Sequence, residues 1–319
     1  MSRPVLAQRL AGRLGMPLAG RAHVSVGPVD LVLTRERRAL DFLALTKPRV
    51  LAMILMATVV GYYLGSPGPA DHLRLLHTFM ATALAAAGTL ALNQFLEREV
   101  DARMERTRLR PLPDGRLQPI EALVFGAAVT VAGLLYLVLA IGLLCGIVAA
   151  ATVGLYLFAY TPLKLKSPLC VVVGAIPGAL PPVIGWVAAR GELGVGACVL
   201  FSILFLWQFP HTLAIARLNR EDYARAGIRV LPVVDPDGMS TERQIVTGCL
   251  ALLPVSLLST LVGLTGAVYF FGALTLGVAF LGFGMAQAVS RSVPTARRLL
   301  FASLWYLPML LALMAFDKV

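Results

Sequence analysis

The chain has 319 residues, of which 58% are hydrophobic and only 14% are charged. A soluble domain carries roughly 25% charged residues, so this composition excludes an ordinary soluble protein and indicates an integral membrane protein. The formal net charge is +11, but the arginines fall mainly between apolar runs, where the positive-inside rule accounts for many of them. Nucleic acid is therefore not an expected partner.

Residues 1–40 differ from the rest of the chain. They contain several arginines, no acidic residue before Asp30, and leucines at helical spacing. The segment lacks the apolar core of a signal peptide, so it is either a transit-like amphipathic segment or a basic cytosolic tail. We expect a tail, followed by a membrane domain over 41–319.

Apolar runs of about 20 residues recur along the membrane domain, and each is long enough to cross about 30 Å of hydrocarbon. They predict an all-α polytopic protein whose core is the helix bundle itself. The nine expected spans are 48–66, 75–95, 120–140, 144–161, 169–189, 195–215, 244–264, 268–288 and 298–316.

The loops between these spans alternate in charge. Those at 66–74, 190–194 and 264–268 are short and carry few charges. Lysine and arginine recur in the others, at 96–119, 162–168, 216–243 and 289–298. By the positive-inside rule, the basic loops and the N-terminus are cytoplasmic, and nine spans place the C-terminus outside.

The four cysteines are scattered through apolar segments, and no pair has the spacing of a metal or redox site. We expect them to be small buried hydrophobic side chains. They are Cys145, Cys170, Cys198 and Cys249.

Asn93, Glu97 and Asp101 lie four residues apart at the end of the second span, so a helix places them in one row. The like charges repel, at a few tenths of a kcal/mol for each pair, and a divalent cation would offset this. The row is about 12 Å long, whereas Mg²⁺ binds its ligands at about 2.0–2.1 Å. Two ions, or contacts through water and phosphate, would be needed. The alternative is a solvated helix end with local ion pairs.

Basic residues surround this row. Guanidinium groups bind phosphate oxygens in a bidentate manner, although each single arginine is also explained by topology or anionic lipid. The arginines are Arg98, Arg103, Arg106, Arg108, Arg110 and Arg116, and Lys47, Arg49, Lys164 and Lys166 reach the same membrane edge.

A second carboxylate, Asp222, follows the sixth span. Alone it means little, but facing the acidic row it would complete a two-sided clamp. His211 lies in that span and is either a ligand or catalytic group, or a histidine hydrogen-bonded to the backbone. The glycine- and proline-rich segment 174–186 predicts a kinked helix that either packs closely or lines a cavity.

Six segments, which run from about residue 40 to the end, resemble the UbiA-type intramembrane prenyltransferases. They are LTKPRV (45–50), NQFLEREVDARMERTRLRPLPDGRL (93–117), YTPLKLKSP (160–168), VGAIPGALPPVIGW (173–186), FLWQFPHTLAIARLNREDYARAGIRVLPVV (205–234) and FASLWYLPMLLALMAFD (301–317). The branch that farnesylates protoheme IX is indicated by three of their parts, RPLP (110–113), WQ-x-PH (207–211) and EDY-xx-AG-xxx-LP (221–232).

The resemblance implies nine helices around a central cavity, with Mg²⁺ holding an isoprenyl diphosphate at the cytoplasmic end. It implies Asn93, Glu97, Asp101 and Asp222 as catalytic residues, the three carboxylates being metal ligands. The second acidic motif is reduced to Asn219, Glu221 and Asp222, which leaves the number of ions open. The residues expected to contact substrate are Lys47, Arg98, Arg106, Arg110, Lys164, His211, Arg217 and Tyr223.

The resemblance also implies an activity. A farnesyl group would move from farnesyl diphosphate to a vinyl group of heme b, with addition of water, giving heme O. His211 could face the heme, near its iron or a propionate, and Arg217 is another candidate to bind a propionate. The expected setting is the bilayer of a bacterial inner membrane, or alternatively of the mitochondrial inner membrane. Expected downstream partners are a heme A synthase or terminal oxidase assembly.

Other functions remain open on the sequence alone. A transporter or heme exporter would explain the spans, but it predicts polar groups at mid-membrane, whereas here they gather at one edge. Within the enzyme class, the alternative is prenylation of an aromatic acid for quinones, against which the 205–234 segment argues. A structural subunit would not need the acidic row.

Overall fold

The computed structural model describes residues 28–319, with side chains from Arg37 onward. Contacts within the chain divide it between Leu40 and Asp41. Before that division the structure describes the larger part of helix α2 (Pro28–Leu45). The expectations for the start of the chain, a tail or a transit-like segment, fall mostly on residues 1–27 and lie outside the described part.

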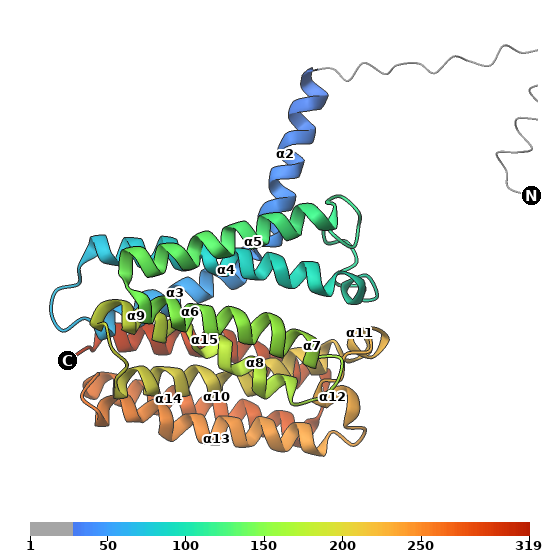
Figure 1. Cartoon of the computed structure of the whole chain (residues 1–319). Helices are drawn as coiled ribbons and strands as arrows, with labels where there is room; N and C mark the ends of the chain where they lie inside the picture. Colours follow the sequence, from blue (N-terminus) through green and yellow to red (C-terminus); the bar gives the residue numbers. More distant parts are fainter. Residues whose placement is uncertain (1–27) are drawn as a thin grey trace, which may run out of the picture. The chain divides into compact units, whose positions relative to one another are not determined.

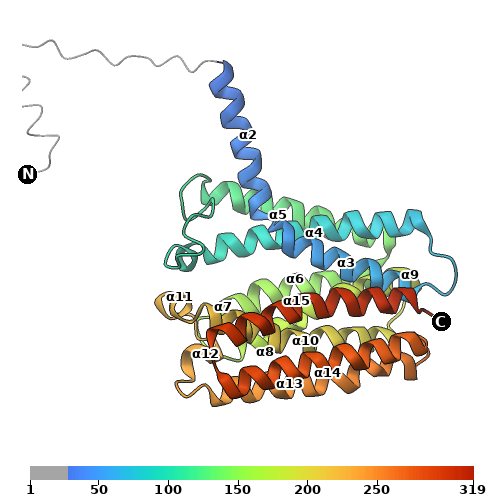
Figure 2. The same cartoon turned by 180° about the vertical axis from the view of Figure 1, so that it is seen from behind.

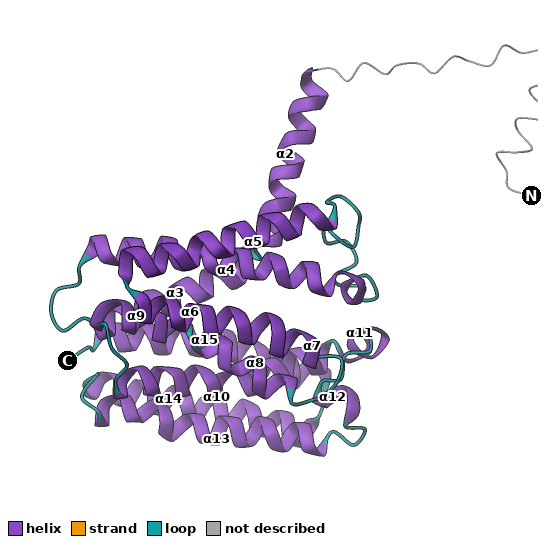
Figure 3. Ribbon diagram, in the orientation of Figure 1, coloured by secondary structure: helices purple, strands orange, loops and turns teal. Residues whose placement is uncertain are grey.

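Within residues 41–319 the architecture is helical, and the described chain contains no strand longer than an isolated bridge (Figure 3). The membrane-length elements are α3 (Pro48–Gly65), α4 (His72–Asp101), α5 (Pro119–Tyr136) with η1 (Leu137–Ile141), α6 (Leu143–Gly154) with η2 (Leu155–Tyr160) and α7 (Thr161–Leu163), α8 (Cys170–Ala179) with α9 (Pro181–Arg190), α10 (Val195–Leu218), α13 (Met239–Leu261), α14 (Ala267–Ser290) and α15 (Val293–Phe316). Two short helices, α11 (Arg220–Arg225) and α12 (Leu231–Val234), lie between α10 and α13.

The described residues contain nine helical segments that are long and apolar enough to cross a membrane, which confirms the predicted all-α fold. The largest differences from the prediction are at the C-terminal end of α4, which continues to Asp101, and at the starts of α13 and α15, which begin before the apolar runs do, as α4 also does. In α4, the Asp71 side chain accepts a hydrogen bond of 3.0 Å from the Arg74 amide and caps the helix. Hydropathy detects the membrane-embedded part of a helix, whereas capping decides where the helix begins.

Two helix breaks have local causes. The third and fourth spans are joined at Gly142 alone, with φ of 144°, a conformation that favours glycine. The fifth span is divided at Leu180, before Pro181 and Pro182, because proline lacks the amide proton that continues a helix. The two predicted interpretations of 174–186 were a kinked helix that packs closely and a helix that lines a cavity. The segment does both, because Gly185 lies against the Thr58 backbone and Pro177 and Pro181 line the cavity.

The helices of residues 41–319 lie side by side (Figures 1 and 2). α3 and α9 pack closely, because a Cβ on Gly61 would meet the backbone of Pro182 and a Cβ on Gly185 would meet the backbone of Thr58. Close approach of small residues is how helices associate without a hydrophobic driving force in lipid. Three cysteines are buried as expected, but Cys198 is exposed, because it lies on the outward face of α10.

The loops 102–118, 164–169 and 219–238 gather at one end of this bundle (Figure 1). We call this end the polar end. It carries the acidic row of α4 and the basic loops, whereas the loops 66–71, 191–194 and 262–266 lie at the opposite end.

Candidate functional site

Asn93 is fully buried on α4 and is held by residues from two other elements. The Lys47 ammonium, just before α3, donates to Asn93 Oδ1 at 2.8 Å, and Asn93 Nδ2 donates to Thr161 Oγ1 at 3.1 Å. Lys47 has a φ of 47°, a left-handed conformation that is rare for residues other than glycine. The contact with Asn93 therefore joins the start of the first span to the acidic row.

The two carboxylates of the row are each paired with a cation. Glu97 Oε1 accepts from Lys164 Nζ at 2.6 Å, and Asp101 Oδ2 accepts from Arg110 at 2.6 Å. Both carboxylates are largely removed from solvent, with side chains 12% and 2% exposed respectively. The interpretation as a solvated helix end therefore does not fit, since buried charges that are paired form a defined site.

The pKa values of the two lysines of the site, Lys47 and Lys164, are shifted in opposite directions. Burial lowers the pKa of Lys47 to about 8; Glu97 opposes this effect, and the charges of Arg110 and Lys164 add to it. Burial also disfavours the charged form of Lys164, but Tyr160 and Glu97 outweigh it and hold its pKa well above the ordinary value. Lys164 is thus a permanent cation, whereas Lys47 can lose its proton near pH 8.

Asp222 brings the two long loops together. From α11 it accepts hydrogen bonds from the backbone amides of Glu105 at 3.3 Å and Arg106 at 3.4 Å, and it also pairs with Arg225. The Arg225 hydrogen bond and the two amides keep the pKa of Asp222 below its usual range, although burial opposes them. A backbone bond of 2.7 Å from Arg229 to the Lys164 carbonyl adds a third loop.

A cavity of about 810 Å³ lies inside the bundle and is lined mainly by apolar side chains from α3, α4, α6, α8, α9, α10 and α15. Two tyrosines of the π-helix η2, Tyr156 and Tyr160, line its wall. The Tyr156 hydroxyl lies 3.5 Å from Asn93 Oδ1, and the Tyr160 ring lies 4.4 Å from Lys164 Nζ. These tyrosines therefore separate the apolar cavity from the charged cluster.

Sequence reasoning did not select Tyr156 or Tyr160. Both stand in an apolar run, and hydrophobic periodicity does not reveal a π-helix, which changes the face that its residues present. The available signal was the position of two tyrosines four residues apart, just before Lys164. π-helical turns are often found at functional sites.

His211 lines the cavity and stacks on Trp207 with ring centroids 4.5 Å apart. Its Nδ1 lies 2.8 Å from Ser303 Oγ, and that hydroxyl donates to the Leu300 carbonyl at 2.7 Å. Because the serine proton is used there, Nδ1 must donate, and Nε2 is left as an acceptor. The structure thus gives His211 a side-chain partner, Ser303, and no backbone carbonyl among the described residues as a partner. Whether His211 is also a ligand or a catalytic group stays a prediction.

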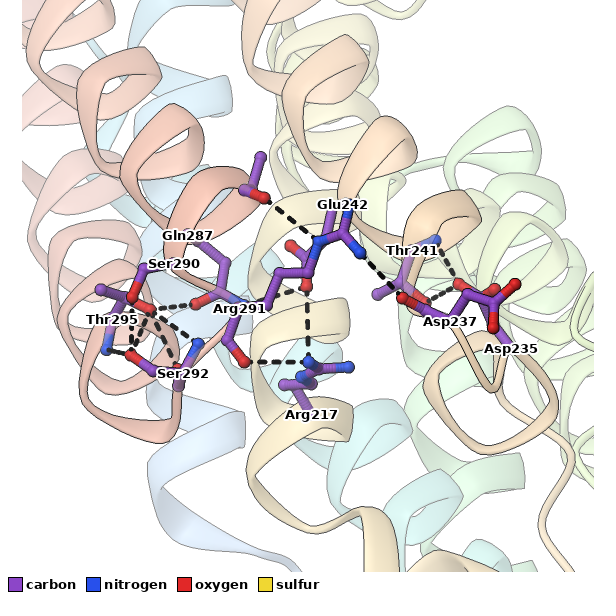
Figure 4. A network of polar contacts seen from close by, with 11 residues as sticks. Arg217, Asp235, Asp237, Thr241, Glu242, Gln287, Ser290, Arg291, Ser292 and Thr295 are labelled. Carbon is purple, nitrogen blue, oxygen red and sulfur yellow. Dashed lines mark hydrogen bonds and ion pairs between the residues drawn. The ribbon is translucent and has the colours of Figure 1, made fainter.

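Arg217 lies in a separate network and is not among the cavity-lining residues (Figure 4). Its guanidinium donates to the Arg291 carbonyl at 3.0 Å and is 4.0 Å from the buried carboxylate of Glu242. Glu242 in turn accepts from Gln287 at 3.0 Å. These contacts link the polar ends of α10, α13 and α14.

The other expected substrate contacts are spread around the polar end. Arg98 donates to the Phe95 carbonyl at 2.9 Å and to Glu99 at 3.1 Å, so it is bound to its own helix. The Arg106 side chain is exposed, and Tyr223 is half-buried against the apolar core.

Within the described residues, no group of three or more histidine, cysteine, aspartate or glutamate side chains could hold a metal ion. Each of the three predicted metal ligands, Glu97, Asp101 and Asp222, instead forms an ion pair with a lysine or arginine. The donor chemistry still suits Mg²⁺, which is bound in proteins by oxygen atoms, usually one or two carboxylates together with substrate phosphates. Glu97 and Asp101 each have a second oxygen outside these ion pairs.

The chain matches known proteins in sequence and in fold. The model of the UbiA prenyltransferase family matches residues 54–310. A protoheme IX farnesyltransferase of Solibacter usitatus (strain Ellin6076) is 50% identical over 287 residues, which are 87% of this chain and 98% of that protein.

Two solved structures show the same fold. A digeranylgeranylglyceryl phosphate synthase superposes with a TM-score of 0.75 at 17% identity, over 88% of this chain and 98% of that one. A UbiA homolog from Archaeoglobus fulgidus bound to GPP and Mg²⁺ superposes with a TM-score of 0.62 at 16% identity, over 86% of this chain and 99% of that one.

Proposed function

Since the chain belongs to the UbiA prenyltransferase family, we propose that it transfers a farnesyl group from farnesyl diphosphate to a vinyl group of heme b, giving heme O. The observation that carries this proposal is the apolar cavity beside a buried cluster of three cations and two carboxylates. Such a site can hold a long isoprenoid chain and a charged diphosphate at the same time. The identity with named protoheme IX farnesyltransferases supports the choice of acceptor.

The reaction begins at the allylic carbon C1 of the donor. The C1–O bond breaks, and its electron pair leaves with the diphosphate. The vinyl group of heme then supplies the electron pair of the new C–C bond, which places a cation beside the porphyrin ring. Water adds to that cation and loses a proton, so the product carries a hydroxyl group. No oxidant or reductant is needed.

Stabilising the departing charge is the main task of the charged cluster. Lys47, Arg110 and Lys164 would bind the diphosphate oxygens, because fixed cations in a site shielded from water act most strongly on developing charge. Asn93 positions Lys47 through their hydrogen bond. Asp101 and Glu97 hold Arg110 and Lys164 in place before the substrate arrives.

The carboxylates have a second role with Mg²⁺. A bound Mg²⁺ would supply Lewis-acid neutralisation of the diphosphate. Glu97 and Asp101 would hold it through their remaining oxygens, together with diphosphate oxygens, which agrees with the lack of a three-carboxylate cluster in the described residues. Asp222 would contribute as a ligand or by holding the loop that carries Arg106.

The apolar cavity would hold the farnesyl chain and keep water away from the allylic cation until the vinyl group has reacted. Tyr156 and Tyr160 stand where the cavity meets the charged cluster, so their rings would shield C1. His211 lines the cavity and its Nε2 is left as an acceptor, so we assign it to the acceptor substrate, near the heme iron.

The proposal includes a location. The basic loops support a cytoplasmic orientation of the polar end in a bacterial inner membrane. Farnesyl diphosphate would enter from there, and heme O would pass to a heme A synthase or to terminal oxidase assembly.

The test uses membranes that contain the protein, supplied with heme b and farnesyl diphosphate, and measures heme O by mass. The wild-type chain should produce heme O, and chelation of divalent cations should stop the reaction until Mg²⁺ is restored. Asp101→Asn should nearly abolish the product, because the buried pairing with Arg110 is weakened and a metal ligand is lost.

Asp114→Asn is the matched control, since Asp114 lies in the adjoining loop and pairs with Arg116 at the surface. Protein abundance and thermal midpoint would show that each variant folds. Full activity of Asp101→Asn would remove that residue from the site. A wild-type chain that prenylates an aromatic acid and leaves heme b unchanged would overturn the proposed acceptor.

A further inference from the structure

Arg49 is the one lysine, arginine or carboxylate residue among the described residues that line the cavity. The other polar lining residues are threonines, tyrosines, a glutamine and His211. The Arg49 side chain is exposed, and it has no hydrogen bond or ion pair with any residue in the described part of the chain. Because an exposed side chain that lines a cavity lies where the cavity opens, this cation stands at the mouth of a mainly apolar volume.

The first turn of α3 directs its two cations to different places. Lys47 precedes Pro48 in a left-handed conformation, and its ammonium contacts Asn93 in the charged cluster. Arg49, two residues later, lies on the cavity side. One short segment therefore supplies one cation to the cluster that would bind diphosphate and another to the cavity that would bind the acceptor.

The acceptor in the proposed function has chemistry that fits Arg49. Heme b has an apolar macrocycle with two propionate groups on one edge, and a carboxylate that enters an apolar cavity needs a cation. Arginine binds carboxylates in a bidentate manner. Arg217, expected from the sequence to serve a propionate, is instead bound to Arg291 and Glu242, away from the cavity lining.

We propose that Arg49 binds a propionate of the heme at the cavity mouth and thereby orients the macrocycle in the cavity. This inference rests on the proposed function. Because the propionates and the vinyl groups occupy different edges of the porphyrin, holding the acidic edge at the mouth limits which vinyl carbons can reach C1 of the donor. Arg49 would thus determine specificity for an acidic tetrapyrrole, and Lys47 would serve the donor.

The experiment compares wild type with Arg49→Gln, Arg49→Lys and the control Arg298→Gln. Arg298 is also exposed, and it does not line the cavity. Heme b and its dimethyl ester, which lacks the propionate charges, are titrated into the purified full-length protein by visible absorption, without donor. KM values for heme b and farnesyl diphosphate are then measured separately.

Arg49→Gln should weaken heme b binding and raise its KM by about tenfold or more, as expected for loss of a charged hydrogen bond, with the farnesyl diphosphate KM within about twofold of wild type. The wild-type preference for heme b over the ester should disappear in Arg49→Gln and return partly in Arg49→Lys. Arg298→Gln should match wild type in every measurement.

Two results would overturn the inference: an unchanged preference for heme b over its ester in Arg49→Gln, or an equal rise in both KM values. The second result would show that Arg49 supports the binding of both substrates and does not select the acceptor. Failure of the wild-type chain to make heme O is a different outcome, because it would contradict the proposed function while the heme titration still reports on Arg49.

Discussion

Lys47 combines an unusual backbone conformation with a depressed pKa, and both follow from its place in the site. A left-handed conformation costs about 1–2 kcal/mol for a residue other than glycine, and burial lowers the pKa of its ammonium to about 8. The contact with Asn93 helps to keep the side chain in the cluster. Its charge is therefore available for binding only below about pH 8.

We predict that the KM for farnesyl diphosphate rises as pH increases through about 8, by at most about tenfold per pH unit. The charges that face Lys47 are Glu97, Asp101, Arg110 and Lys164, and only Lys47 among the lysines of the site is expected to titrate here. Lys47→Arg should flatten the profile, since arginine keeps its charge. A profile of unchanged shape in that variant would show that another group controls binding.

The lowered pKa of Lys47 affects folding stability in the direction opposite to its effect on donor binding. The folded-state pKa lies below the ordinary value of 10.5, so the folded protein bears a cost for the charged form below pH 8. That cost fades as pH rises from about 8 to about 10.5. Donor binding and folding stability should therefore change in opposite directions over this interval.

The extent of sequence prediction at this scale can be judged from the acidic row. The spacing of Asn93, Glu97 and Asp101 placed them on one helix face, because helix geometry is local. Their partners could not be derived by spacing, since Lys47 and Lys164 are 46 and 67 residues from the side chains they contact. The roles of these residues stay predictions until variants are measured.

Among the elements, α3 and α9 show how backbone contact shapes the cavity. Their glycines bring the two backbones together, and the adjoining segments of both helices line the cavity. The sequence predicted a kinked, glycine-rich helix here because proline and glycine act locally. It did not predict the π-helices η1 and η2. In these spans nearly every residue is apolar, so the sequence shows no change of face where the helix becomes wider.

We predict that Gly185→Ala destabilises the protein by about 1–3 kcal/mol, the usual effect of overpacking, because the added Cβ would meet the Thr58 carbonyl. The thermal midpoint in detergent should fall by several degrees. Gly282→Ala is the control: nothing lies within 4 Å of a Cβ there, and alanine favours helix by up to about 1 kcal/mol. Equal midpoints for the two variants would contradict close packing of α3 on α9.

For the whole molecule, contacts between the two long loops join the polar regions that follow α4 and α10. Hydropathy predicted that both loops lie at one end of the bundle, and the structure agrees. The contacts between them include the hydrogen bonds from two backbone amides to Asp222 and the exposed ion pair of 3.8 Å between Arg225 and Glu105. Sequence reasoning assigned Asp222 to the second wall of the clamp but could not predict amide partners, which depend on how the chain after α4 turns.

We predict that Asp222→Ala loosens the loop after α4 without unfolding the bundle. The amides of Glu105 and Arg106 would lose their acceptor, so peptides covering 102–108 should exchange hydrogen faster, whereas peptides from the buried parts of α10 and α13 should not change. Asp237→Ala is the matched control, because Asp237 is an exposed carboxylate of the same 219–238 loop. Its exchange pattern should match wild type near 102–108.

The kinetic consequence separates two roles of Asp222. If the carboxylate acts by holding the first loop, Asp222→Asn, which keeps one acceptor oxygen, should retain part of the protection at Glu105 and Arg106, and its KM for farnesyl diphosphate should lie between those of wild type and Asp222→Ala. If the carboxylate acts mainly as a metal ligand, both variants should lose activity alike while Asp222→Asn keeps wild-type exchange. Unchanged exchange in Asp222→Ala would show that the two loops are joined by other contacts, such as the ion pair of 3.8 Å between Arg225 and Glu105.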